Sequence, residues 1–166
     1  MILHFPRISK QNIMKKLVEI CKKENINYDI PGLKRLMFCS NYDIRQCINN
    51  TEYISYSMDK ITEITVDNMI DIPKLYNIIQ ILKLCNEHNF ISAINMTIIS
   101  YNSGFSANDI LLTFLKYIEN NTENEISKQL ELYKIISVYY MKVNSSIDSI
   151  LQLYACISKI YLLYIC

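Results

Sequence analysis

The chain has 166 residues, of which 51% are apolar and 20% charged, and it contains 2 Gly, 3 Pro and no Trp. Its 17 basic and 16 acidic residues exclude the high net charge of a disordered protein, and its length suits one ordinary domain or two small ones. Two glycines are too few for a glycine-rich phosphate loop or a flexible linker, so the composition predicts a soluble, mostly helical protein.

Residues 1–71 predict a unit of three helices. Ser9 is suited to cap the first helix, and Pro31 occupies a first-turn position of the second. The Ser-Asn-Tyr-Asp stretch at residues 40–43 has turn and cap chemistry, so a third helix is expected to follow it. Residues 55–72 predict a polar connection with a short helix near 65–70.

Pro73 marks a boundary, because the residue before a proline is biased out of helical conformation. Five further helices are predicted near 74–87, 89–101, 106–120, 123–143 and 145–165. The last one is apolar most of the way round, which favours contact with another subunit. Its expected core stripe is Ile147, Ile150, Leu151, Tyr154, Ile157, Tyr161 and Leu162. The predicted fold class is all-α.

The charge pattern and the cysteines point to no specific ligand. Residues 1–50 hold nine basic and four acidic residues, a weaker excess than an independent nucleic-acid-binding domain carries. The excess is centred on seven of the nine, Lys15, Lys16, Lys22, Lys23, Lys34, Arg35 and Arg45, and most of these lysines are expected on solvated helix faces. The six cysteines form no C-x-x-C pair, which predicts reduced thiols in an intracellular protein. No apolar run approaches 18 residues, so no membrane contact is expected.

Catalytic and metal-binding motifs are not found in the sequence. It contains neither G-x-x-x-x-G-K-[ST] nor G-x-G-x-x-G, and neither histidine lies near a candidate nucleophile. We therefore predict no catalytic residue and no metal ligand in these 166 residues. On these grounds the sequence describes an interaction module.

Several short motifs occur in a defined order: Phe-Pro-Arg-Ile-Ser at 5–9, Glu-Asn-Ile at 24–26, Gly-Leu at 32–33, Asp-Ile-Arg at 43–45 with Asn-Asn at 49–50, Gly-Phe-Ser-Ala-Asn-Asp-Ile at 104–110, and residues 143–153. Their order and spacing resemble the lid and collar domains of the small subunits of replication factor C, the eukaryotic sliding-clamp loader. The resemblance spans nearly the whole chain.

This resemblance implies an all-α, three-helix AAA+ lid at residues 1–71 and a roughly five-helix collar at residues 72–166. It also implies that Arg45 is the sensor 2 arginine, which reaches from a lid helix toward the phosphates of bound ATP. A guanidinium suits that task because it is always charged and presents several donors in a fixed fork. The alternative is a surface arginine at a helix start, where the helix dipole slightly disfavours it.

The sequence departs from the family pattern at the start of the third helix. Tyr42 replaces the family's glycine before Asp43, so a turn with positive φ is expected to be strained or differently shaped. Thr51-Glu52 replaces the usual Leu-Gln pair. Nucleotide sensing is therefore expected to be weakened even with the fold intact.

The resemblance further implies that the ATP and Mg²⁺ sites of the intact parent lie in an ATPase domain before residue 1, so a sequence truncated at its N-terminus is expected. Without a phosphate cradle and metal ligands, these residues alone cannot hydrolyse ATP by the family's mechanism. The implied partners are other clamp-loader subunits in a hetero-pentamer, joined through the collar. The sliding clamp and primer-template DNA would be contacted through the preceding domain, in the nucleus.

Two other interpretations remain open at this stage. A free-standing all-α scaffold or adaptor would use its last helix as a docking face and have no nucleotide role. A related AAA+ protein of another branch would share the lid and collar. The sequence does not identify the small subunit, although the Asp-Ile-Arg step disfavours the one with a degenerate lid.

Overall fold

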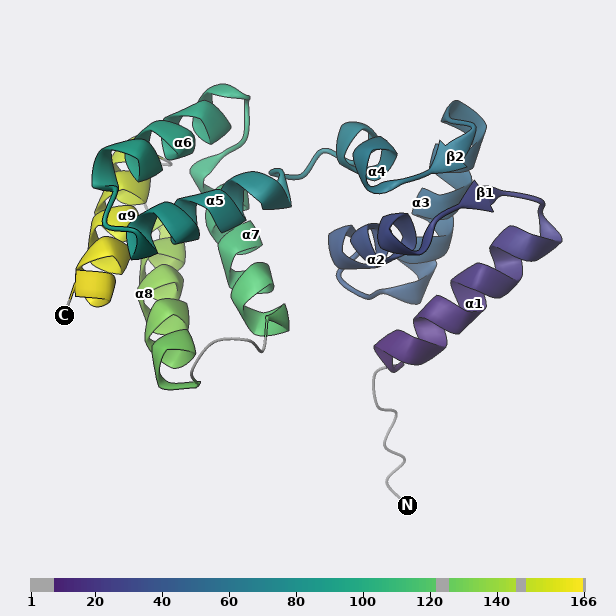
Figure 1. Cartoon of the computed structure of the whole chain (residues 1–166), viewed down its shortest axis with the longest axis horizontal. Helices are drawn as coiled ribbons and strands as arrows, with labels where there is room; N and C mark the ends of the chain where they lie inside the picture. The colour runs from purple at the N-terminus through teal and green to yellow at the C-terminus, as the bar shows by residue number, and fades with distance from the viewer. Residues whose placement is uncertain (1–7, 122–125, 146–148, 166) are drawn as a thin grey trace, which may run out of the picture. The chain divides into compact units, whose positions relative to one another are not determined.

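The computed structural model describes residues 8–121, 126–145 and 149–165, which form nine α-helices and two short strands (Figure 1). The all-helical prediction is confirmed. The chain divides into two compact units, Met1–Asp71 and Ile72–Cys166, and each is described by itself. Residues 5–7 of the first motif and Ile147 of the expected core stripe lie outside the described residues.

The N-terminal unit contains α1 (Lys10–Lys23), β1 (Asn27–Tyr28), α2 (Ile30–Cys39), α3 (Ile44–Ser57), β2 (Lys60–Ile61) and α4 (Glu63–Met69). The three longer helices lie where the sequence predicted them, and the short α4 begins two residues before the expected position. The strands were not predicted. They pair in parallel, with Asn27 opposite Lys60 and Tyr28 opposite Ile61.

Each helix of this unit begins at a polar side chain that accepts a hydrogen bond from a free backbone N–H. These caps are Ser9 for α1, Asp29 for α2, Asp43 for α3 and Thr62 for α4. Thr62 belongs to a capping box, since the Thr65 hydroxyl also accepts from the Thr62 N–H at 2.7 Å. The helix boundaries are thus encoded locally, by residues that satisfy the first-turn donors.

Gly32 lets α2 approach the end of β2 without an intervening side chain. A Cβ at this position would lie 2.6 Å from the carbonyl oxygen of Ile61 and 2.8 Å from the Cα of Thr62. Both are backbone atoms, which cannot rotate away from an added methyl group. The first turn of α2 therefore packs directly against the backbone that leads into α4.

The C-terminal unit contains α5 (Leu75–Asn86), α6 (Phe90–Asn102), α7 (Ala107–Asn120), α8 (Ile126–Ser145) and α9 (Ile150–Ile165). These five helices match the predicted number for residues 72–166. Helix α7 packs against α8 and α5 against α6, while α9 contacts α5, α6 and α8. Among the helices of the described residues, none is both long enough and apolar enough to cross a membrane.

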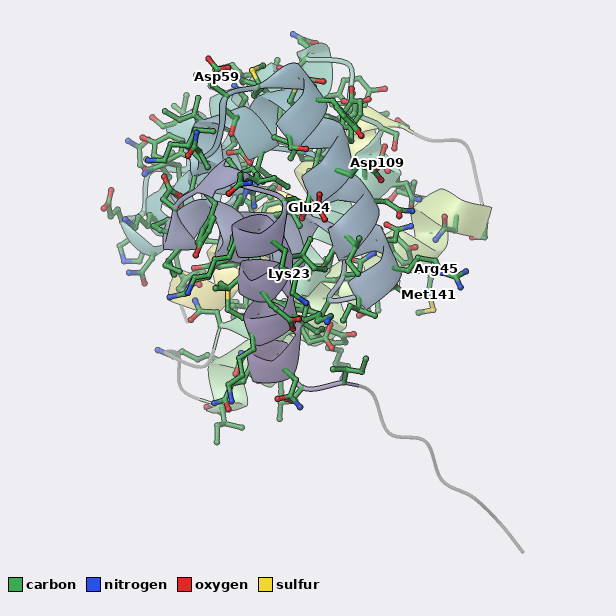
Figure 2. All side chains as sticks on the ribbon, turned by 90° about the vertical axis from the view of Figure 1, so that its right-hand side faces the viewer. Lys23, Glu24, Arg45, Asp59, Asp109 and Met141 are labelled. Atoms are coloured by element: carbon green, nitrogen blue, oxygen red, sulfur yellow. The ribbon has the colours of Figure 1, made fainter. Side chains whose placement is uncertain are left out.

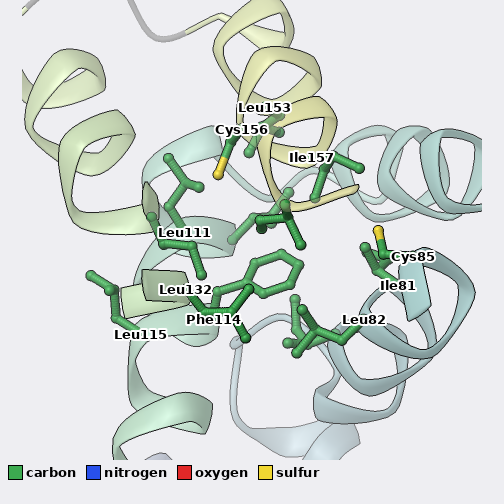
Figure 3. Packing of buried hydrophobic residues seen from close by; sticks show 14 of the residues in the cluster. Ile81, Leu82, Cys85, Leu111, Phe114, Leu115, Leu132, Leu153, Cys156 and Ile157 are labelled. Atoms are coloured by element: carbon green, nitrogen blue, oxygen red, sulfur yellow. The ribbon is translucent and has the colours of Figure 1, made fainter. Parts of the chain in front are cut away.

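Phe114 on α7 lies at the centre of the C-terminal core, and its side chain is fully buried (Figure 3). Leu111 on the same helix, Ile81 on α5 and Leu132 on α8 are among the buried residues of this cluster. An aromatic ring buries a large apolar area, so one such residue can serve several helices at once.

The buried face of α9 differs from the expected core stripe. Leu153, Cys156, Ile157 and Ile160 are fully buried, whereas Leu151, assigned to the stripe by the sequence, is 69% exposed. Leu162 of that stripe is also exposed. Because almost every position of α9 is apolar, periodicity alone does not select a face. The selection comes from α5, α6 and α8, against which the helix packs.

We expect the free energy of unfolding of the C-terminal unit to fall as pH rises above about 9. Burial raises the pKa of the Cys85 thiol from 9.0 to about 11, and burial with the nearby Cys85 raises that of Cys156 to about 12. Between these values the unfolded chain loses thiol protons that the folded chain keeps. In this range each thiol lowers the free energy of unfolding by on the order of 1 kcal/mol per pH unit.

Urea unfolding at pH 8.0, 9.5 and 10.5 measures the slope of the free energy of unfolding against pH. A Cys85→Ala/Cys156→Ala variant is the control, and its stability should fall less steeply with pH although it starts lower. Equal slopes for the two proteins would contradict the assignment to the thiols. Burial raises the pKa of Tyr164 in both proteins, and the part of that rise due to Cys85 is removed in the control together with the thiols.

Candidate functional site

Arg45 lies in the first turn of α3, at the exposed surface of the N-terminal unit, and its side chain extends away from the ribbon (Figure 2). Asp43 caps this helix by accepting a hydrogen bond from the Gln46 N–H at 3.0 Å. Within the part of the chain that the structure describes, Arg45 makes no hydrogen bond or ion pair. Its guanidinium donors are therefore available to an external acceptor such as a phosphate.

The turn before α3 has an unusual backbone. Asn41 and Tyr42 have φ values of 52° and 56°, both in the left-handed region. A tyrosine thus occupies a position of positive φ in this turn. This agrees with the expectation of a strained turn at Tyr42, because a side chain with a Cβ crowds the backbone there.

Arg35, part of the basic excess of residues 1–50, lies in the interior of the N-terminal unit. It is only 7% exposed, and its Nε donates to Oδ1 of Asp67 on α4 at 2.5 Å. Its guanidinium also lies 5.4 Å from the ring centre of Phe38. The apolar Phe38 and Cys39, three and four residues later on the same helix face, are the sequence signal that position 35 faces inward.

The C-terminal unit exposes two rows of mainly apolar side chains. On α9 the exposed apolar residues are Leu151, Leu162 and Ile165, with the partly exposed Ala155 and Ser158 between them, and we call this row the α9 stripe. On α8 they are Ile126, Leu130, Tyr133 and Met141, with the partly exposed Ser137 between them, and we call this row the α8 stripe. Steps of three and four residues place each row on one face of its helix.

Both stripes are open to solvent in this chain. Leu162 and Ile165 of the α9 stripe are 50% and 51% exposed, and Leu130 of the α8 stripe is 65% exposed. Figure 2 shows the Met141 side chain projecting from α8 away from the ribbon. Large apolar side chains gathered in this way are typical of a surface that another protein covers.

Sites for ATP and Mg²⁺ were assigned by the sequence analysis to a preceding domain. Within the described residues, no group of three or more His, Cys, Asp and Glu could hold a metal ion. Arg45, exposed and unpaired, fits a single contact to a phosphate oxygen. These residues could therefore supply one donor to a bound nucleotide, while the nucleotide itself would be held elsewhere.

The structure thus has two helical units, one with an exposed arginine at a helix start and the other with two exposed rows of mainly apolar side chains. Residues 73–159 match the family described as "Replication factor C C-terminal domain". The match covers more than half of the chain and nearly all of the five-helix unit. The chain therefore belongs to the replication factor C family.

Similarity to individual relatives extends over both units. The chain is 26% identical to "Replication factor C subunit 4" of Saccharomyces cerevisiae, covering 96% of the chain and 49% of the relative. It is 27% identical to "Putative replication factor C small subunit R395" of Acanthamoeba polyphaga mimivirus, and this match covers 96% of the chain and 50% of the relative. It is 25% identical to "Replication factor C small subunit" of Methanosphaera stadtmanae, and this match covers 97% of the chain and 51% of the relative. The chain thus spans about half the length of these relatives.

Proposed function

We propose that this chain is the lid and collar part of a clamp-loader small subunit, with residues 1–71 as the lid and 72–166 as the collar. The observation that carries the proposal is the family match over residues 73–159. Similarity to proteins named as replication factor C subunits over 96% of the chain extends the proposal to the N-terminal unit. The free-standing adaptor has no comparable support.

The collar would join the chain to other clamp-loader subunits through the α8 and α9 stripes. Removing exposed leucine and isoleucine side chains from water favours association by about 25 cal/mol for each Å² of apolar surface buried. The α9 stripe is suited to such a contact because Lys159 is the only charged side chain on α9 and lies off the stripe. A partner can therefore cover the stripe without burying a charge.

Assembly is tested with the variants Leu151→Asp and Leu162→Asp, each of which places a charge on the exposed α9 stripe. Each should weaken association with partner subunits at least ~30-fold, as expected for an interface residue contributing about 2 kcal/mol. Sedimentation of the chain co-expressed with clamp-loader subunits measures this. Lys159→Glu, an acid on the same helix outside the stripe, is the matched control. A chain that does not co-purify with these subunits favours the adaptor interpretation.

The nucleotide part of the proposal concerns Arg45. ATP and Mg²⁺ would bind an ATPase domain N-terminal to residue 1, and the lid would bring the Arg45 guanidinium to a phosphate oxygen when it closes. That domain would also contact the sliding clamp and primer-template DNA. The net charge of +1 on these residues supports this division, because phosphate contacts need a basic surface. The proposal of a preceding ATPase domain is supported if the reading frame upstream of residue 1 encodes G-x-x-x-x-G-K-[ST] in frame. An upstream frame without this motif contradicts it.

For Arg45→Ala in the assembled clamp loader, we expect about tenfold weaker ATP binding, since a hydrogen bond to a charged group contributes roughly 1.5–3 kcal/mol. Arg45→Lys should recover part of the affinity, because it keeps the charge without the planar fork. Titration with a fluorescent ATP analogue measures both variants. Lys34→Ala, which removes an exposed positive charge from α2, is the control. Equal affinities for the Arg45→Ala and Lys34→Ala complexes would exclude nucleotide sensing by Arg45.

The nuclear location is also part of the proposal. It rests on relatives named as replication factor C subunits in Saccharomyces cerevisiae and Schizosaccharomyces pombe. Microscopy of the fluorescently tagged protein in its own cell tests it.

A further inference from the structure

The turn between α2 and α3 contains a residue whose side chain disfavours the backbone conformation that the residue adopts. Asparagine adopts the left-handed conformation readily, but a tyrosine at φ 56° is strained because its Cβ crowds the backbone. Such a conformation persists only when surrounding contacts hold it. The contacts around Tyr42 therefore determine whether the turn keeps this shape.

Contacts of two kinds are among those that hold the turn. The Tyr42 N–H donates to the carbonyl oxygen of Met37 and the Asp43 N–H to that of Ser40, each at 3.0 Å. Any residue at position 42 could make these backbone bonds. In addition, the ammonium of Lys10 lies 4.4 Å from the centre of the Tyr42 ring. This cation–π contact requires an aromatic side chain at 42 and a cation at 10.

The contact joins the first turn of α1 to the residue immediately before the cap of α3. Tyr42 directly precedes Asp43, whose carboxylate fixes the first turn of α3, and Arg45 lies in that turn. The backbone dihedral angles of residue 42 therefore set the direction in which α3 begins. They also set the direction in which the Arg45 guanidinium is presented.

We propose that Tyr42, held by Lys10, is a positioning residue for Arg45, so that α1 takes part in presenting the guanidinium to a phosphate. This inference rests on the nucleotide-sensing role proposed above for Arg45. A glycine at position 42 would adopt the same φ without strain and without any link to α1. With tyrosine, the start of α3 depends on whether Lys10 stays over the ring.

The test uses Lys10→Gln, which removes the cation and keeps most of the side chain, in the assembled clamp loader. ATP affinity should fall about two- to fivefold, which corresponds to the usual strength of an exposed cation–π contact. Lys10→Arg keeps the cation over the ring, so it should bind ATP like the parent. Lys15→Gln is the matched control, because Lys15 is an exposed lysine of the same helix.

A double variant separates positioning from general damage. In the Arg45→Ala background, Lys10→Gln should cause no further loss of ATP affinity. A further loss there, or equal effects of Lys10→Gln and Lys15→Gln, would overturn the inference. If Arg45→Ala weakens ATP binding while Lys10→Gln does not, only the positioning role fails. If Arg45→Ala has no effect, the sensing role and the inference fail together.

Amide hydrogen exchange of the 166-residue chain supplies a readout without nucleotide. In Lys10→Gln the N–H groups of Tyr42, Asp43 and Gln46 should exchange faster than in Lys15→Gln, because the turn and the first turn of α3 open more often. Unchanged exchange at all three amides would also overturn the inference.

Discussion

Replacing Asp67 by alanine is expected to lower the free energy of unfolding of the N-terminal unit by about 3 kcal/mol. The Arg35 side chain is 6% exposed and that of Asp67 24%, so the ion pair between α2 and α4 is largely withdrawn from water. Arg35 Nη1 is buried without a hydrogen-bond partner. Loss of Asp67 would leave the whole guanidinium buried without a counter-charge.

Hydrogen exchange of peptides from α2 and α4, followed through a urea titration, measures this loss in the N-terminal unit itself. Arg35→Leu removes the buried charge together with its need for a partner, and should cost less than about 1 kcal/mol. Glu63→Ala, which removes an exposed acid from α4, is a second control. A loss for Asp67→Ala no larger than for either control would show that the ion pair does not stabilise the unit.

Phe114→Ala should destabilise the C-terminal unit by about 3–5 kcal/mol. The ring is fully buried on α7, a helix that contacts α5, α6, α8 and α9, so its removal leaves a cavity in a core shared by all five helices. Small domains are stable by about 5–15 kcal/mol, and this loss is a large part of that total. The variant should therefore unfold at markedly lower urea concentration.

Circular dichroism at 222 nm with hydrogen exchange of α7 peptides measures the effect. Phe114→Leu refills much of the cavity and should lose about 1–2 kcal/mol, in line with smaller changes of buried volume. Tyr76→Ala removes an aromatic ring that is 64% exposed on α5, and should change stability by no more than about 0.5 kcal/mol. Equal losses for Phe114→Ala and Tyr76→Ala would contradict the central position of Phe114.

The helices could be predicted because the information that begins each one lies within a few residues. Ser9, Asp43 and Ser106 each accept a hydrogen bond from the backbone N–H three residues later, which is the pattern that the sequence displays. The strands β1 and β2 could not be found in this way. They are two residues long and 31 residues of chain lie between them, so their pairing depends on how α2 and α3 pack.

Burial was harder to predict than helix position. Arg35 is charged, which is typical of a surface residue, and only the apolar Phe38 and Cys39 three and four residues later indicate that it faces inward. On α9, where apolar residues occur on every face, the buried side is selected by neighbouring helices. Of the candidate site, Arg45 could be placed at an exposed helix start from its motif, but the support of that turn by Lys10 could not. It joins residues 32 positions apart.

The close approach at Gly32 has a mechanical consequence for the N-terminal unit. Side chains between two helices can change rotamer and absorb a displacement, but two of the three atoms nearest a Cβ at Gly32 belong to the backbone, the carbonyl oxygen of Ile61 and the Cα of Thr62. The third is Oδ1 of Asp29. Backbone atoms have no rotamers to change, so this contact can absorb little displacement between α2 and the segment that joins β2 to α4. We therefore expect these segments to move together more closely than elements that touch only through side chains.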